Sequence, residues 1–96
     1  MLQSYNFLFE FMEFLGKKWV VPLLLLLLIY EQANFSYLKK HLKITSRALS
    51  KKLKLLESIG LVEKAAIDNP KKFLYCLSDR GKEISAMLLK LSSGIQ

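Results

Sequence analysis

An uncharged, apolar segment of twelve residues from Trp19 to Tyr30 most limits what this chain can fold into. A helix that spans a bilayer needs about 20 apolar residues, and charged residues flank this segment on both sides. Its late position, with two glutamates before it, is also atypical of a signal peptide. We therefore predict a fully buried core helix from about residue 20 to residue 32, with Pro22 in its first turn.

The N-terminal segment, residues 2–15, is also rich in large apolar side chains. Its length, its lack of β-branched residues and the glycine at position 16 favour a helix. On a helix these side chains cover almost the whole circumference, whereas a surface helix needs one apolar stripe. We expect a second copy of the chain to bury the surplus.

The positive charge of the chain is concentrated in one window. The chain has 15 basic and 8 acidic side chains, for a net charge of +7. Residues 39–54 contain seven of the basic residues and no acidic residue, so the other 80 residues sum to zero. Charge segregated in this way indicates a surface that binds a polyanion.

This basic window coincides with two predicted helices joined by a short turn. Ser36 can cap a helix over 37–42, and the three residues 43–45 form the turn. Thr45 or Ser46 then caps a helix over 46–59, which Gly60 closes. Its core positions follow helical spacing and are Leu49, Leu53, Leu56 and Ile59. Residues 36–59 therefore match the helix-turn-helix pattern.

After Gly60 the apolar period changes to two. Residues 61–67 and 72–77 read as two strands of a hairpin around an Asp-Asn-Pro turn, and together 61–77 form a wing. Ser78 caps a last helix over 79–93, with a predicted apolar face of Ile84, Met87, Leu88 and Leu91. The prediction is a mainly α, winged helix-turn-helix fold in one domain, residues 1–96, of order H-H-H-H-E-E-H.

The face of helix 46–59 opposite its leucines has the composition of a DNA reader. Its residues are Ser46, Arg47, Ser50, Lys51 and Lys54. Arginine and lysine can donate to guanine O6 and N7 in the major groove, serine can donate or accept, and a helix N-terminus favours phosphate. Further candidate contacts to the DNA backbone are Lys39, Lys40 and Lys43, with Lys71 and Lys72 at the wing tip.

Few residues in this chain can carry other chemistry. One cysteine, Cys76, and one histidine, His41, allow neither a disulfide framework nor a multi-ligand zinc site. We expect Cys76 to be a buried structural residue. We also expect no metal, no cofactor and no enzymatic activity, and a reducing, cytoplasmic location.

Several short motifs follow one another in a fixed order along the chain: Gly16-Lys17-Lys18-Trp19, Phe35, Leu38, Ile44, Leu49-Ser50-x-x-Leu53-x-x-Leu56, Gly60-Leu61-Val62 and Tyr75-x-Leu77-Ser78-x-x-Gly81. Together they resemble the motifs of the HxlR-type regulators, a winged-helix family within the broader MarR-like group. The resemblance spans about residues 16–84 and implies a dimeric transcriptional regulator whose terminal helices, 2–15 and 79–93, pair. Such regulators often have a cysteine shortly before the Gly-Lys-Trp block, which some of them use for redox or electrophile sensing, and this chain has none there.

These features predict sequence-specific binding of double-stranded DNA, to a pseudo-palindromic operator, by a homodimer. Three alternatives remain open at this point. Helix 46–59 can present an ordinary solvated face, although such faces usually mix charges of both signs. The fold can also serve as a protein-interaction module without DNA. The aromatic N-terminal helix and the basic window can instead bind an anionic membrane surface.

Overall fold

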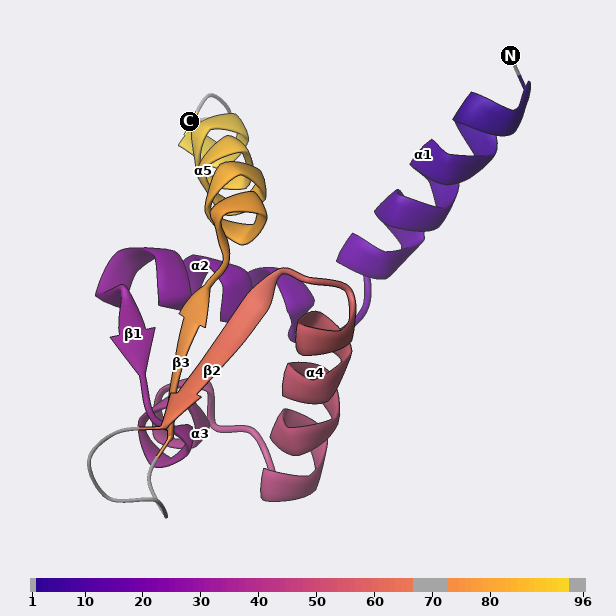
Figure 1. Ribbon diagram of the computed structural model, residues 1–96. Helices are drawn as coiled ribbons and strands as arrows, with labels where there is room; N and C mark the ends of the chain where they lie inside the picture. Colours follow the sequence, from indigo (N-terminus) through magenta and orange to yellow (C-terminus); the bar gives the residue numbers. More distant parts are fainter. Residues whose placement is uncertain (1, 67–72, 94–96) are drawn as a thin grey trace.

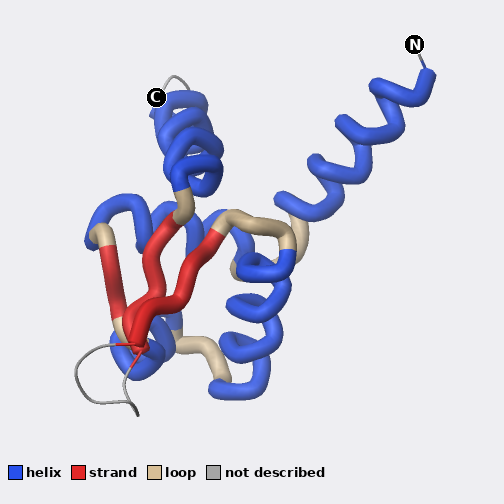
Figure 2. Tube along the Cα trace, in the orientation of Figure 1, coloured by secondary structure: helices blue, strands red, loops and turns tan. Residues whose placement is uncertain are grey.

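The computed structural model describes residues 2–66 and 73–93, with side chains from residue 5 onward (Figure 1). It confirms the mainly α, winged helix-turn-helix fold and adds one strand that the sequence did not indicate. The described part of the chain has five helices and three strands. Figure 2 shows helices packed around a small sheet, with the N-terminal helix projecting away from it. The elements are α1 (Leu2–Leu15), α2 (Val20–Tyr30), β1 (Gln32–Ala33), α3 (Phe35–Leu42), α4 (Ser46–Ser58), β2 (Val62–Ala66), β3 (Phe73–Leu77) and α5 (Asp79–Ser93).

Helix α2 buries one side rather than its whole circumference. Its buried residues, Val20, Leu23, Leu24 and Leu27, follow helical spacing, whereas Ile29 is 62% exposed. The prediction of a fully buried helix was therefore wrong. The described helices include none long and apolar enough to cross a membrane.

The helix also ends earlier than predicted, at Tyr30. Glu31 takes a positive φ of 66°, which turns the chain out of the helix. Gln32 and Ala33 then form β1, the strand absent from the predicted order. A strand of two residues carries no readable alternation, and only its pairing with β3 defines it.

The helix-turn-helix has the predicted three-residue turn, and one of its predicted caps differs. Asn34, not Ser36, caps α3, because its Oδ1 accepts the backbone N–H of Tyr37 at 2.8 Å. Thr45 caps α4, with its Oγ1 accepting from the N–H of Ala48 at 3.2 Å. Gly60 has the predicted positive φ, 78°, just beyond α4.

The three strands form an antiparallel sheet in the order β1-β3-β2. Cys76 is the central residue of one cross-strand row, with Gln32 opposite it on β1 and Glu63 opposite it on β2. The adjacent row on β3 belongs to Tyr75, which is buried. The predicted turn at 68–70 and the ends of the predicted strands next to it lie outside the described residues.

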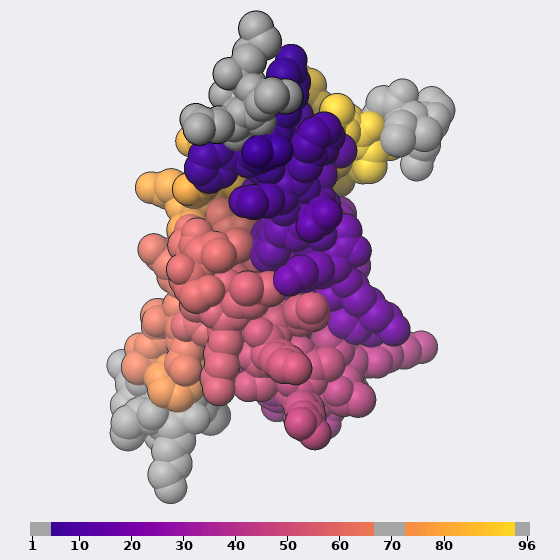
Figure 3. Space-filling view, turned by 90° about the vertical axis from the view of Figure 1, so that its right-hand side faces the viewer, coloured from indigo at the N-terminus to yellow at the C-terminus, as the bar shows by residue number. Residues whose placement is uncertain are grey.

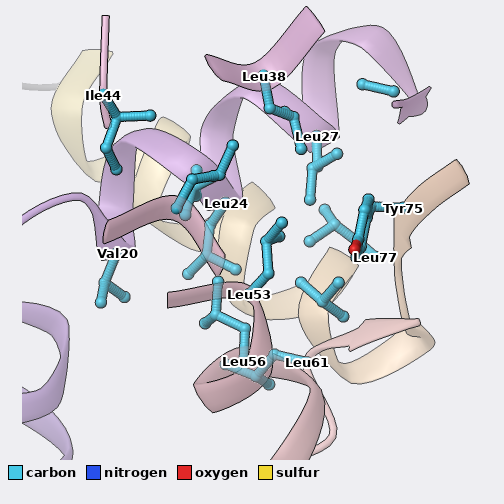
Figure 4. Packing of buried hydrophobic residues seen from close by; sticks show 14 residues of the cluster. Val20, Leu24, Leu27, Leu38, Ile44, Leu53, Leu56, Leu61, Tyr75 and Leu77 are labelled. Carbon is cyan, nitrogen blue, oxygen red and sulfur yellow. The ribbon is translucent and has the colours of Figure 1, made fainter. Parts of the chain in front are cut away.

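A leucine cluster joins the helices to the sheet. Figure 4 shows side chains from α2, α3, α4 and β3 pointing toward one another, with Leu24, Leu53 and Tyr75 among them. Leu49, Leu53 and Leu56 of α4 are buried as predicted. Ile59, the fourth predicted core position, is 41% exposed because the helix has already ended at Ser58.

Helix α5 packs on α2, and its fully buried positions are small residues. Gly81 and Ser85 are its buried residues, and Ile84 and Leu88 are half-buried beside them. The predicted face was therefore half right, because Met87 and Leu91 are 64% and 67% exposed. The helix turns its glycine and serine to the core, and Gly81 lies against the backbone of Leu61.

A short junction ties the end of α4 to the start of α5. Ser78 donates its backbone N–H to the carbonyl of Leu61 at 3.0 Å and its Oγ–H to the carbonyl of Gly60 at 2.6 Å. The same Oγ accepts the backbone N–H of Gly81 at 3.0 Å. Ser78 therefore caps α5, as the sequence predicted. A Cβ on Gly81 would collide with the carbonyl oxygen of Leu61, so this position requires glycine.

Helix α1 extends away from the rest of the molecule (Figure 1). The Cα radius of gyration is 14.2 Å, compared with about 12.5 Å for a compact chain of this length. Phe7 and Phe9 are 76% and 60% exposed, while Phe14 and Leu15 pack against the core. The predicted surplus of apolar surface on this helix is present.

The glycine at the junction makes a stability prediction. Gly81→Ala should lower the free energy of unfolding by about 1–3 kcal/mol, because the new methyl group displaces the Leu61 backbone. Helix propensity alone would raise the free energy of unfolding by up to about 1 kcal/mol. The sign of the measured change therefore distinguishes the steric effect from the propensity effect. Urea denaturation followed by circular dichroism measures the change.

Gly16→Ala is the matched control, since a Cβ there meets backbone atoms only at an ordinary 3.5 Å. It should change the free energy of unfolding by less than about 1 kcal/mol. Equal effects of the two substitutions would contradict the proposed close packing at Gly81.

Candidate nucleic-acid interface

Helix α4 lies at the surface with one side in the core and the other side open. Figure 3, which views the molecule from the α4 side, shows this helix uncovered beside β2. The buried leucines fix its rotation about its own axis, and Ile44, which is 5% exposed, anchors the turn before it. The open side therefore carries the residues of α4 that lie opposite the buried leucines.

The structure brings the five predicted α4 residues onto this open side. Arg47, Lys51 and Lys54 are exposed at successive turns, Ser46 is exposed at the N-terminus, and Ser50 is half-buried between them. The first turn of α4 contains no acidic side chain. Its free backbone N–H groups and the neighbouring cations together make this end of the helix favourable for phosphate.

The predicted lysines of α3 lie next to the turn. Lys39 and Lys40 are exposed in the last turn of α3. Lys43 ends the helix with a left-handed φ of 53°, and its backbone N–H bonds to the carbonyl of Lys39. Their positive charges are well placed at the C-terminal end of the helix dipole.

A cluster of aromatic rings, which sequence reasoning missed, borders these lysines. The ring centroids of Tyr37 and His41 are 4.3 Å apart, and Tyr30 lies 5.5 Å from each. Desolvation, with a hydrogen bond to Tyr30, raises the pKa of the Tyr37 hydroxyl above its ordinary value. The i, i+4 spacing of Tyr37 and His41 is the sequence signal that could have indicated this aromatic cluster.

The wing contributes one further cation in its described part. Lys64 on β2 is exposed, and its Nζ lies 4.3 Å from the ring centroid of Phe73 on β3. The predicted backbone contacts Lys71 and Lys72 lie outside the described residues. Lys64 was missed because a single lysine in a strand pattern gives no signal of its own.

Cys76 is half-buried rather than buried, since its strand position faces away from the leucine cluster. Among residues 2–66 and 73–93, no group of three or more His, Cys, Asp or Glu side chains could hold a metal ion.

Comparison with known proteins places this geometry in a family context. The family model described as HxlR-like helix-turn-helix matches residues 14–96. The chain is 34% identical over 82 residues to the uncharacterized HTH-type transcriptional regulator YvaP of Bacillus subtilis (strain 168), which covers 83% of this chain and 75% of YvaP.

Two solved structures share the fold. The reduced form of the transcriptional regulator YodB from B. subtilis superposes with a TM-score of 0.74 at 23% identity, covering 88% of this chain and 83% of YodB. An apo-form mutant of ZitR from Lactococcus lactis gives a TM-score of 0.76 at 19% identity, covering 97% of this chain and 70% of ZitR.

The cap of α4 makes a second stability prediction. Thr45→Ala removes the acceptor for the N–H of Ala48 and should lower the free energy of unfolding by about 1 kcal/mol. Thr45→Ser keeps the hydroxyl and should stay within about 0.5 kcal/mol of the parent. Thermal and urea denaturation measure both variants, and a serine variant as weak as the alanine variant would contradict the capping role.

Proposed function

Because this chain belongs to the HxlR-like helix-turn-helix family of transcriptional regulators, we propose that it binds double-stranded DNA sequence-specifically as a homodimer. Membership makes it a DNA-binding transcription regulator, a class distinct from enzymes. The finer proposal is that α4 enters the major groove while lysines of α3 and of the wing contact the backbone. We also propose that residues 1–96 act as a single domain.

The exposed basic side of α4 carries this proposal. Arg47, Lys51 and Lys54 repel one another at successive turns, and no acidic residue between positions 39 and 54 offsets them. A helix surface of this kind is stabilised by an anionic partner. Its exposure, opposite a fully buried leucine stripe, leaves it free to enter a groove.

In this proposal, different residues contact the phosphates and the bases. Phosphate contacts set affinity and register, whereas contacts to base edges set sequence preference. We assign base reading to Ser46, Arg47, Ser50 and Lys51, because the N-terminal part of a recognition helix reaches the base edges. Backbone contacts are assigned to Lys54, Lys39, Lys40, Lys43, Lys71 and Lys72.

Dimerisation is supported by the apolar surface that the single chain leaves uncovered. Five large side chains of α1 are between 49% and 76% exposed: Tyr5, Phe7, Leu8, Phe9 and Met12. Three of α5 are also exposed: Met87, Leu89 and Leu91. Exposed apolar area on this scale marks an interaction surface. A two-fold dimer would present two α4 helices to a pseudo-palindromic operator.

The DNA proposal predicts a specific loss on substitution. Arg47→Ala with Lys51→Ala should weaken duplex binding about tenfold or more. Each phosphate that the protein neutralises contributes about −0.9 to the slope of log affinity against log salt. Fluorescence anisotropy with a duplex of about 20 base pairs, enriched from a random pool, measures both quantities.

Lys82→Ala with Lys90→Ala removes the same charge from exposed positions of α5 and is the matched control. This control should change the affinity for the duplex by less than about twofold at moderate salt, because the two removed charges are remote from α4 and screened by salt. Equal losses in both double variants would sink the recognition-helix assignment and favour binding by net charge. Absence of duplex binding by the parent would favour the protein-interaction or membrane alternative.

The dimer proposal predicts that a charge on α1 separates the subunits. Phe7→Glu and Phe9→Glu should each convert a dimer into a monomer in size-exclusion chromatography with light scattering, since burying an unpaired carboxylate is costly. Phe73→Glu, on the wing, should leave the dimer intact. A parent protein that stays at 11.1 kDa at high micromolar concentration would refute dimerisation.

A further inference from the structure

The described part of the wing carries a cation and an aromatic ring that are paired across its two strands. The ammonium nitrogen of Lys64, on β2, lies 4.3 Å from the centroid of the Phe73 ring, on β3. Lys64 is exposed, and Phe73 keeps 38% of its surface open to solvent. A cation within about 6 Å of an aromatic ring is attracted by the negative face of that ring. The two side chains therefore hold each other at the surface.

The strand register sets which face of the sheet carries this pair. Lys64 lies opposite Tyr75, and Ala66 lies opposite Phe73. Because successive side chains of a strand point to opposite faces, Lys64, Phe73 and Tyr75 share one face. Tyr75 is buried in the leucine cluster on that face. The pair therefore continues the core face of the sheet toward the tip of the wing.

This part of the wing adjoins the exposed basic side of α4. In the sheet order β1-β3-β2, the strand that carries Lys64 is an outer strand, and it contacts α4. Figure 3 shows β2 and the start of β3 at the surface, on the same side of the molecule as α4. A duplex bound to the open side of α4 would therefore run past this pair.

The ring changes what binding a phosphate would cost the lysine. A lysine side chain that is immobilised on binding loses rotamer freedom, which weakens an interaction by about two- to tenfold. The Phe73 ring already restricts the ammonium group to one region, so part of that freedom is lost on folding instead. The ammonium group has three N–H donors. Since the ring covers one side of this group, the other side stays open to phosphate oxygens.

We propose that Lys64 contacts a backbone phosphate of bound DNA and that Phe73 is the positioning residue for this contact. The inference rests on the proposed DNA binding and extends it beyond the basic window of residues 39–54. Only the pairing of β2 with β3 brings the two side chains together.

Fluorescence anisotropy across a salt series, with the duplex enriched for the parent protein, tests the phosphate contact. Lys64→Gln should weaken duplex binding about three- to tenfold and make the slope of log affinity against log salt shallower by about 0.9, the contribution of one phosphate. Lys82→Gln removes the same charge from an exposed position of α5 and is the matched control. The control should change the affinity by less than about twofold. An unchanged slope for Lys64→Gln, or an equal change for Lys82→Gln, would overturn the contact.

A double-mutant cycle tests the positioning role. Phe73→Leu keeps an apolar side chain but removes the ring face, and should weaken duplex binding about two- to fivefold. The salt slope should stay as in the parent, because the ammonium group still reaches the phosphate. Phe73→Tyr, which keeps the ring, should restore the affinity.

In the Lys64→Gln background, Phe73→Leu should have no further effect, since no cation is left to position. A loss of equal size in both backgrounds would mean that the ring acts by itself, and would overturn the positioning role. Both positions are exposed, so these variants should fold, which circular dichroism checks.

The same measurements separate this inference from the proposed function. If Lys64→Gln binds like the parent while Arg47→Ala with Lys51→Ala loses affinity, the DNA proposal stands and the Lys64 contact is wrong. A parent protein that binds no duplex would overturn both.

Discussion

The junction between Gly60–Leu61 and Ser78–Gly81 sets the geometry on which the rest of the molecule depends. Ser78 binds two successive backbone carbonyls just beyond α4, and Gly81 lets α5 approach the second of them without a side chain between. The end of α4 and the start of α5 are thereby held together. If α5 pairs with a second copy, this junction transmits the placement of the subunits to α4.

The core built around α2 explains why the molecule has two distinct exposed surfaces. Val20, Leu23, Leu24 and Leu27 contact the other elements, so that α4 is held with its charged side outward. The same core leaves α1 projecting, because one small cluster of leucines cannot also cover its phenylalanines. A small domain buries a limited fraction of its surface, and the excess is available to a partner.

The sequence predicts helix caps and the left-handed glycine correctly where the interactions that define them are local. The cap at Thr45, the left-handed residue Gly60 and the cap at Ser78 each depend on residues within four positions, apart from the longer bond that Ser78 also makes. Ile59 and Met87 were misplaced because apolar spacing does not tell where a helix ends or which side turns to the core. Asn34, and not the predicted Ser36, caps α3. Asparagine and serine both suit an N-cap, and only the path of the chain from β1 selects between them.

The amino-acid sequence by itself determined the segregation of charge into residues 39–54, the three-residue turn and the change of period after Gly60. Those properties follow from side-chain order and from helical or strand periodicity, which need no distant contacts. Only the tertiary structure decided that β1 pairs with β3 and that α5 presents Gly81 and Ser85 inward. These depend on contacts between residues far apart in the chain, whose geometry is set by close packing of the whole core.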